Sequence, residues 1–233
     1  MNSTRKSALV AGVFYLLTFV SIPTLALYAQ VRDANYIVGS SADTSVLIGA
    51  VLEVIVALAG IGTAVALFPV VKRQNEGVAR GFAGSRTLEA AMIFAGIACL
   101  LSVVTLRQAG AGAEALFTGR MLVALYDRLF LLGQSLMPVV NAVLLGYLLY
   151  RSRLVPRALP LLGFFGAALL VAADAAILFG LIGRSSALAG ITALPIALWE
   201  FSLGVWLVVK GFNSSAVTAM SAKTATNELL GAA

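Results

Sequence analysis

The stretch Val46–Val71 reads VLIGAVLEVIVALAGIGTAVALFPVV and contains a single ionisable side chain, Glu53. An α-helix needs about 20 consecutive apolar residues to cross the hydrocarbon core of a membrane. Such a run satisfies its backbone hydrogen bonds internally, and it lacks the alternating pattern of a barrel strand. We therefore predict a transmembrane helix over these residues.

Similar apolar runs occur on both sides of this stretch, and together they predict an all-α fold. We expect a polytopic transmembrane bundle of six helices, with both termini cytoplasmic, as a single domain over residues 1–212. Residues 213–233 are small and polar with few apolar anchors, which predicts a short disordered cytoplasmic tail. The six spans are expected at about residues 8–29, 46–71, 88–106, 121–150, 161–182 and 191–209.

The composition points to lipid as the solvent of this chain. Hydrophobic residues make up 61% of it and charged residues 11%, with a mean hydropathy of +0.99. A soluble domain carries roughly 45–50% apolar and about 25% charged residues. The Lys and Arg residues are scattered between apolar runs, so they indicate membrane topology and contacts with anionic lipid head groups at cytoplasmic loops. They do not indicate nucleic-acid binding.

Counting Lys and Arg in the connections predicts the orientation. The first span resembles a cleavable signal peptide, but its apolar run of about 22 residues exceeds the 7–15 typical of one, so we expect it to be retained. Cytoplasmic segments carry an excess of Lys and Arg. With the N-terminus inside, one side holds Arg5, Lys6, Lys72, Arg73, Arg80, Arg86, Arg151, Arg153, Arg157, Lys210 and Lys223, and the other holds Arg32, Arg107, Arg120 and Arg184.

Several classes of chemistry are excluded by the residues that the chain lacks. It has no histidine, which removes the commonest metal ligand and general base, and its one cysteine, Cys99, lies in an apolar run. No phosphate-binding loop, nucleophile elbow or CxxC motif occurs. We predict no catalytic residue, no cofactor and no metal site. An enzyme is the least favoured class, because it would have to work with carboxylates alone.

The strongest chemical signal is a set of ionisable residues inside apolar runs, where a charge costs at least about 2.5–3.5 kcal/mol. Asp174 and Glu200 are the firmest cases, because neither flanking piece is long enough to span alone. Glu53 and the pair Asp127-Arg128 lie nearer the outer surface. The acids fall roughly 10–14 Å from the outer ends of their spans, so we expect a shared layer in which Arg128 pairs with one carboxylate. We expect Glu89, by contrast, to reach the cytoplasmic interface.

This layer, the candidate intramembrane polar site, has two interpretations. One is a small transporter or ligand-sensing protein with an unidentified small-molecule or ion ligand. The alternative is a non-transporting structural or regulatory membrane partner whose buried charges only fix helix packing. Pro138, beside Gln134 and Asn141, predicts either a broken helix that lines a cavity or a packed kink. Small residues at i,i+4 spacing, such as Ala8 and Gly12, favour close helix packing and allow a homo-oligomer.

Three stretches of the chain resemble a known family. They are the basic N-terminus followed by Ala11–Thr18 (AGVFYLLT), the connector Tyr150–Arg157 (YRSRLVPR) and the closing Trp199–Asn213 (WEFSLGVWLVVKGFN). Together they resemble the bacterial membrane family catalogued as domain of unknown function 4386, over nearly the whole chain from Arg5 to Asn213. The resemblance implies a six-span protein of the bacterial inner membrane, and it implies no particular activity.

Overall fold

The computed structural model describes residues 3–39 and 42–231, with side chains described up to residue 222. Within these ranges every regular element is helical, and six helical segments are long and apolar enough to cross a membrane. This confirms the predicted all-α, six-span class. The spans are Ser3–Leu27, Thr44–Val71 (α3), Glu76–Gln108 (α4), Ala113–Ser152, Ala158–Leu178 (α7) and Ala187–Val209 (α8).

Two of the spans are composite. The first consists of α1 (Ser3–Leu17), a 3₁₀ turn (Thr18–Ser21) and the short α2 (Thr24–Leu27), with Pro23 just before α2. The fourth begins with a 3₁₀ turn (Ala113–Ala115), continues as α5 (Leu116–Phe130), passes through a π-helical turn (Leu131–Leu136) and ends as α6 (Met137–Ser152). Pro138 lies in the first turn of α6, directly after the π-helical turn.

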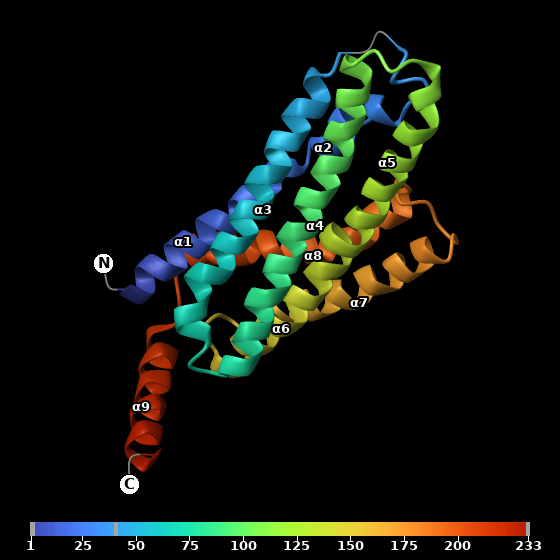
Figure 1. Ribbon diagram of the computed structural model, residues 1–233. Helices are drawn as coiled ribbons and strands as arrows, with labels where there is room; N and C mark the ends of the chain where they lie inside the picture. Colours follow the sequence, from blue (N-terminus) through green and yellow to red (C-terminus); the bar gives the residue numbers. More distant parts are fainter. Residues whose placement is uncertain (1–2, 40–41, 232–233) are drawn as a thin grey trace.

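The spans form a closed ring in chain order. α3 packs against α1 and α4, and α6 packs against α4 and α7. The ring closes because α8 contacts both α7 and α1, so the last span meets the first (Figure 1). A Cβ on Gly12 of α1 would lie 2.7 Å from the carbonyl oxygen of Gly204 in α8. This contact can form only with glycine, and the small face of α1 is therefore used within the chain.

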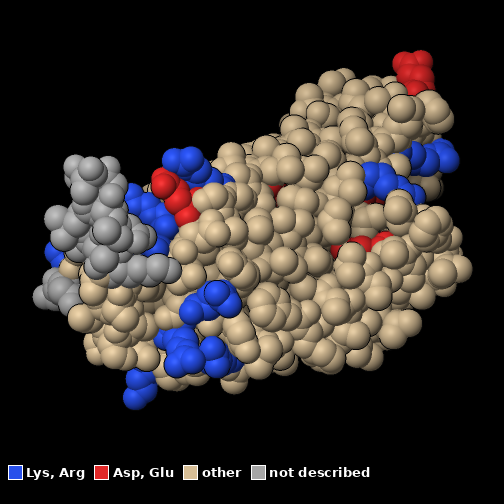
Figure 2. All heavy atoms as spheres, turned by 90° about the horizontal axis from the view of Figure 1, so that it is seen from below, with Lys and Arg blue, Asp and Glu red and all other residues tan. Residues whose placement is uncertain are grey.

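The N- and C-terminal ends of the described chain lie at one end of the bundle (Figure 1), which we call the proximal end. The connection between α3 and α4 also lies there. The distal end carries the segment between α2 and α3 and the turns from α4 to α5 and from α7 to α8. Charged side chains gather toward both ends of the face in Figure 2, and a broad, nearly uncharged band separates them.

Two regions differ from the sequence expectation. α4 begins at Glu76 and not near residue 88, because the Asn75 side chain caps it and Glu76 pairs with Arg80 one turn later. Residues 214–231, which we expected to be part of a disordered tail, form α9 (Ser214–Gly231). The side chain of Asn213 caps the start of this helix, because it accepts a hydrogen bond from the Ser215 amide. Met220 of α9 is buried against the bundle.

Candidate functional site

A group of charged side chains lies near the middle of the bundle, where α4 faces α8. Arg86 donates to Glu89 one turn further along α4 (3.0 Å) and to Glu200 of α8 (2.9 Å). Arg86 lies ten residues after Glu76, about 15 Å along the helix. Its side chain is 2% exposed, so this ion pair network belongs to the interior.

Two polar residues complete this group. Asn141 of α6 donates to the same Glu89 oxygen (2.7 Å), and Ser85 donates to Asn141 (2.5 Å). The guanidinium of Arg86 also stacks against the rings of Tyr15 and Phe82. We call Ser85, Arg86, Glu89, Asn141 and Glu200 the central cluster. It is enclosed by aromatic and aliphatic side chains, as a packing element would be.

A second polar region lies nearer the distal end, around Glu53 of α3. Its side chain is fully buried, and one of its oxygens accepts hydrogen bonds from Tyr126 (2.8 Å) and Gln134 (3.1 Å). Its other oxygen is buried without a partner in the described structure. A buried carboxyl group left half satisfied is costly unless it holds a proton or meets a further group.

Asp174 of α7 repeats this arrangement. One of its oxygens accepts a hydrogen bond from Ser135 (2.5 Å), and the other is also buried without a partner. Gln134 and Ser135 are neighbours in the π-helical turn, so this turn presents one donor to Glu53 and the next to Asp174. π-helical turns inside α-helices are frequently found at functional sites.

The third acid of this region, Asp127, is held by two arginines from distal segments. Arg32 binds it through both terminal nitrogens (2.8 and 2.9 Å), and Arg184 binds it from the turn between α7 and α8. We call these three residues the distal ion cluster. Arg184 also stacks on the ring of Phe130 (3.9 Å). Burial lowers the pKa of Arg184, the attraction of Asp127 opposes this shift, and the nearby charge of Arg32 adds to it.

A cleft of about 400 Å³ lies between these two groups of residues and opens near the distal end. Its wall includes Arg32, Arg184, Gln134 and Ser135, with Tyr28 and Tyr126 beside them. No acidic side chain lines this distal cleft among the residues described for it. Glu53 and Asp174 do not line the cleft themselves. They accept hydrogen bonds from Tyr126, Gln134 and Ser135, which do.

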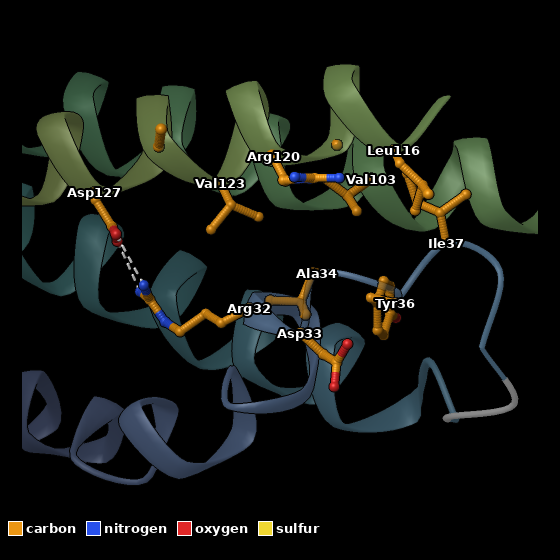
Figure 3. A pocket seen from close by; sticks show the side chains of 13 residues that line it. Arg32, Asp33, Ala34, Tyr36, Ile37, Val103, Leu116, Arg120, Val123 and Asp127 are labelled. Atoms are coloured by element: carbon orange, nitrogen blue, oxygen red, sulfur yellow. Dashed lines mark hydrogen bonds and ion pairs between the residues drawn. The ribbon is translucent and has the colours of Figure 1, made fainter. Parts of the chain in front are cut away.

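A smaller cavity of about 190 Å³ adjoins the cleft on the side of α4 and α5. Figure 3 shows Arg32 reaching from the segment after α2 to Asp127 on α5, with Tyr36 and Val123 among the residues around the cavity. Arg32 lines both this cavity and the distal cleft. Its ion pair with Asp127 therefore stands between the two spaces.

The structure divides the predicted polar layer. Glu53, Asp127 and Asp174 gather around the distal cleft, but Glu200 belongs to the central cluster. Arg128 lies on the exposed side of α5 and forms no ion pair in the described structure. Asp127, one of the carboxylates of the expected layer, binds Arg32 and Arg184 instead. Glu89 is buried with Arg86 and does not reach the interface as expected.

Sequence reasoning missed Arg86 as a site residue, because its place among other basic residues favoured a loop. The i,i+3 spacing of Arg86 and Glu89 was an available signal for a helical ion pair. Arg32 and Arg184 were counted only as loop charges. Among the described residues no group of three or more His, Cys, Asp or Glu could hold a metal ion.

Comparison with known proteins identifies a family. The family model described as Domain of unknown function (DUF4386) matches residues 10–211, which is most of the chain. No curated protein and no solved structure matches the chain. Together with the six apolar spans, the family match shows a multi-pass membrane protein.

Proposed function

We propose that this chain, which belongs to the family described as Domain of unknown function (DUF4386), binds a small organic anion in the distal cleft and couples that binding to the uptake of a proton. We place the protein in the inner membrane of a bacterium, with the distal cleft opening outward. The orientation rests on the excess of basic residues at the proximal end, which persists after Arg86 is removed from the loop count.

The observation that carries the proposal is the composition of the cleft wall. Two guanidinium groups line it and no carboxylate does. Both groups bind Asp127, but Arg184 and Arg32 each keep N–H donors that Asp127 does not use. Guanidinium groups bind carboxylates with two parallel hydrogen bonds. A cleft of about 400 Å³ suits a molecule of a few carbon atoms carrying one or two carboxylates.

The coupling to a proton follows from the two acids behind the wall. Glu53 and Asp174 hold Tyr126, Gln134 and Ser135 in place through one oxygen each. A bound anion next to them repels a negative charge, so it favours the protonated form of both carboxyl groups. Their second oxygens are the positions where a proton would reside. Binding would therefore weaken as the pH rises.

The test uses the purified full chain in detergent micelles with lactate, succinate and citrate as separate probes, and it measures affinity by calorimetry. We expect at least one of the three to bind, Arg184→Gln to weaken its binding more than about ten-fold, and Arg120→Gln to leave it unchanged. Arg120 is a matched control, because it is also a distal arginine but does not line the cleft. Equal loss in both variants, or no binding of any probe, would refute the proposal.

The coupling has its own readout. In the wild type we expect the affinity for the bound probe to fall with rising pH, and in Glu53→Gln and Asp174→Asn we expect this dependence to weaken or vanish. Glu200→Gln should retain the wild-type dependence, because Glu200 does not line the cleft and bonds only to Arg86 among the described residues. The alternative interpretation, that buried charges only fix helix packing, then applies to the central cluster.

A further inference from the structure

We propose that a groove at the proximal end binds the phosphate head group of an anionic phospholipid. The groove lies between the connector from α6 to α7 and the connector from α8 to α9, and its volume is about 430 Å³. Arg153, Arg157 and Lys210 line it, with Trp206 and Phe212 as its aromatic wall. This inference does not depend on the distal cleft.

The charges of the groove are all of one sign. Arg153, Arg157 and Lys210 have exposed side chains, no acidic residue lines the groove, and none of the three forms an ion pair within the described part of the chain. Arg157 stacks on the ring of Tyr150 (4.8 Å), which holds its guanidinium at the edge of the groove. Three cations held together without a counterion favour an anion, and a phosphate group accepts hydrogen bonds from all of them.

The walls of the groove are fixed by the fold. The amide of Asn213 donates to the carbonyl of Leu154 (2.9 Å), which joins the two connectors. Leu154 and Val155 are buried, and Arg153 ends α6 in a left-handed conformation with φ of 57°. The basic side chains therefore extend from an anchored backbone, so the ligand does not have to order the loop.

The depth of the groove favours a lipid over a soluble phosphate. Lys210 directly follows the last residue of α8, and Arg157 directly precedes the first residue of α7, so both lie at the boundary of their spans. Tryptophan is enriched at this level of a membrane, and Trp206 lies one turn before Lys210. Val209, next to Lys210 in the chain, and Leu161, about one turn after Arg157, expose their apolar side chains, along which acyl chains would run.

The test compares lipid retention by native mass spectrometry of the full chain, purified in detergent and mixed with dioleoyl phosphatidylglycerol or dioleoyl phosphatidylcholine. We expect the wild type to retain phosphatidylglycerol in preference to phosphatidylcholine. The double variant Arg157→Gln, Lys210→Gln should bind phosphatidylglycerol about thirty-fold more weakly. The matched control Lys72→Gln, Arg80→Gln removes the same charge from the same end of the bundle, outside the groove, and should bind as the wild type does.

The outcomes separate the possible sources of the phosphate group. Equal weakening in the two double variants would show attraction by net charge alone and would overturn the site. Equal retention of the two lipids would overturn the preference for an anion. Displacement of bound phosphatidylglycerol by millimolar inorganic phosphate would identify a site for free phosphate and would overturn the lipid assignment.

Discussion

The central cluster and the distal cleft use the same kinds of side chain in different surroundings. In the central cluster Arg86 and Glu89 are buried, Glu200 is partly buried, and the guanidinium bonds directly to both carboxylates. Around the distal cleft, the arginines line an open space and the acids Glu53 and Asp174 lie behind neutral donors. In the distal region the two arginines share the single carboxylate of Asp127, and they face a cleft rather than packed side chains. We therefore expect the central cluster to contribute mainly to stability and the distal residues mainly to the proposed binding. The comparison can be tested by variants that affect one region and spare the other.

The largest effect is expected from Arg86→Met. It leaves the buried Glu89 and the partly buried Glu200 without a cation, and breaking a buried ion pair costs about 3–5 kcal/mol in free energy of unfolding. The measurement is unfolding in mixed micelles with increasing sodium dodecyl sulfate. Arg80→Met is the control, because the Arg80 side chain is 72% exposed and its ion pair contributes less than about 1 kcal/mol.

A rescue variant makes this prediction sharper. Combining Arg86→Met with Glu89→Gln and Glu200→Gln removes all three charges, and neutral replacement of a buried ion network is often tolerated. We expect most of the lost stability to return. If the triple variant stays as unstable as the single one, the stability of the centre does not depend on charge pairing.

The next effect concerns the closure of the ring beside the central cluster. Gly12→Ala would place a Cβ 2.7 Å from the Gly204 carbonyl oxygen, so α1 must move away from α8 at a cost of about 1–3 kcal/mol. Gly84→Ala is the matched control, since a Cβ there meets nothing within 4 Å and alanine favours a helix. Unfolding in the same micelles measures both. Affinity for a cleft ligand should change little in either variant.

Asp127→Asn affects the distal region alone. Asp127 is partly exposed, so the loss of its charge should change the free energy of unfolding by less than about 1 kcal/mol. The variant frees Arg32 and Arg184 from a competing carboxylate, so the affinity for an organic anion should rise several-fold. Calorimetry measures the change. A fall in affinity would mean that Asp127 positions the two arginines and does not compete for them.

The smallest effect is a pH dependence at the distal surface. Burial alone would raise the pKa of Asp43, but hydrogen bonds from Tyr36, Gln108 and Arg107 outweigh it and hold the pKa below its ordinary value. The stabilisation by the carboxylate is therefore complete above the ordinary pKa of an aspartate, and it is lost as the pH falls through the lowered value. Melting curves at decreasing pH should show a smaller decline for Asp43→Asn than for the wild type.

The six spans could be predicted from the sequence because run length and apolar character alone determine whether a helix can cross a membrane. The start of α4 could not, since Glu76 and Arg80 look like loop charges until the cap at Asn75 and the i,i+4 pair are considered together. α9 was missed for a similar reason, because its apolar anchors, such as Met220, are few and its start depends on Asn213.

The candidate site was predicted in part. Asp174, Glu200 and Glu53 were found because a charge inside an apolar run needs a partner, and each of them has one. The identity of those partners depends on which spans are neighbours, and a single sequence does not contain the order of helices in a ring. Arg86 bonds to a residue 114 positions away, and nothing local to Glu200 indicates it.

The π-helical turn at Leu131–Leu136 has a consequence for the phase of the whole fourth span. Before this turn Tyr126 faces Glu53, and after it Asn141 faces Glu89. A π-helical turn accommodates an additional residue relative to an α-helix, and each residue rotates an α-helix by about 100°. Deleting one residue here would rotate the two halves of the span relative to each other. A regular helix could then keep the contact of Tyr126 with Glu53 or that of Asn141 with Glu89, but not both. The π-helical turn therefore allows α5 and α6, within one continuous span, to face two different partners.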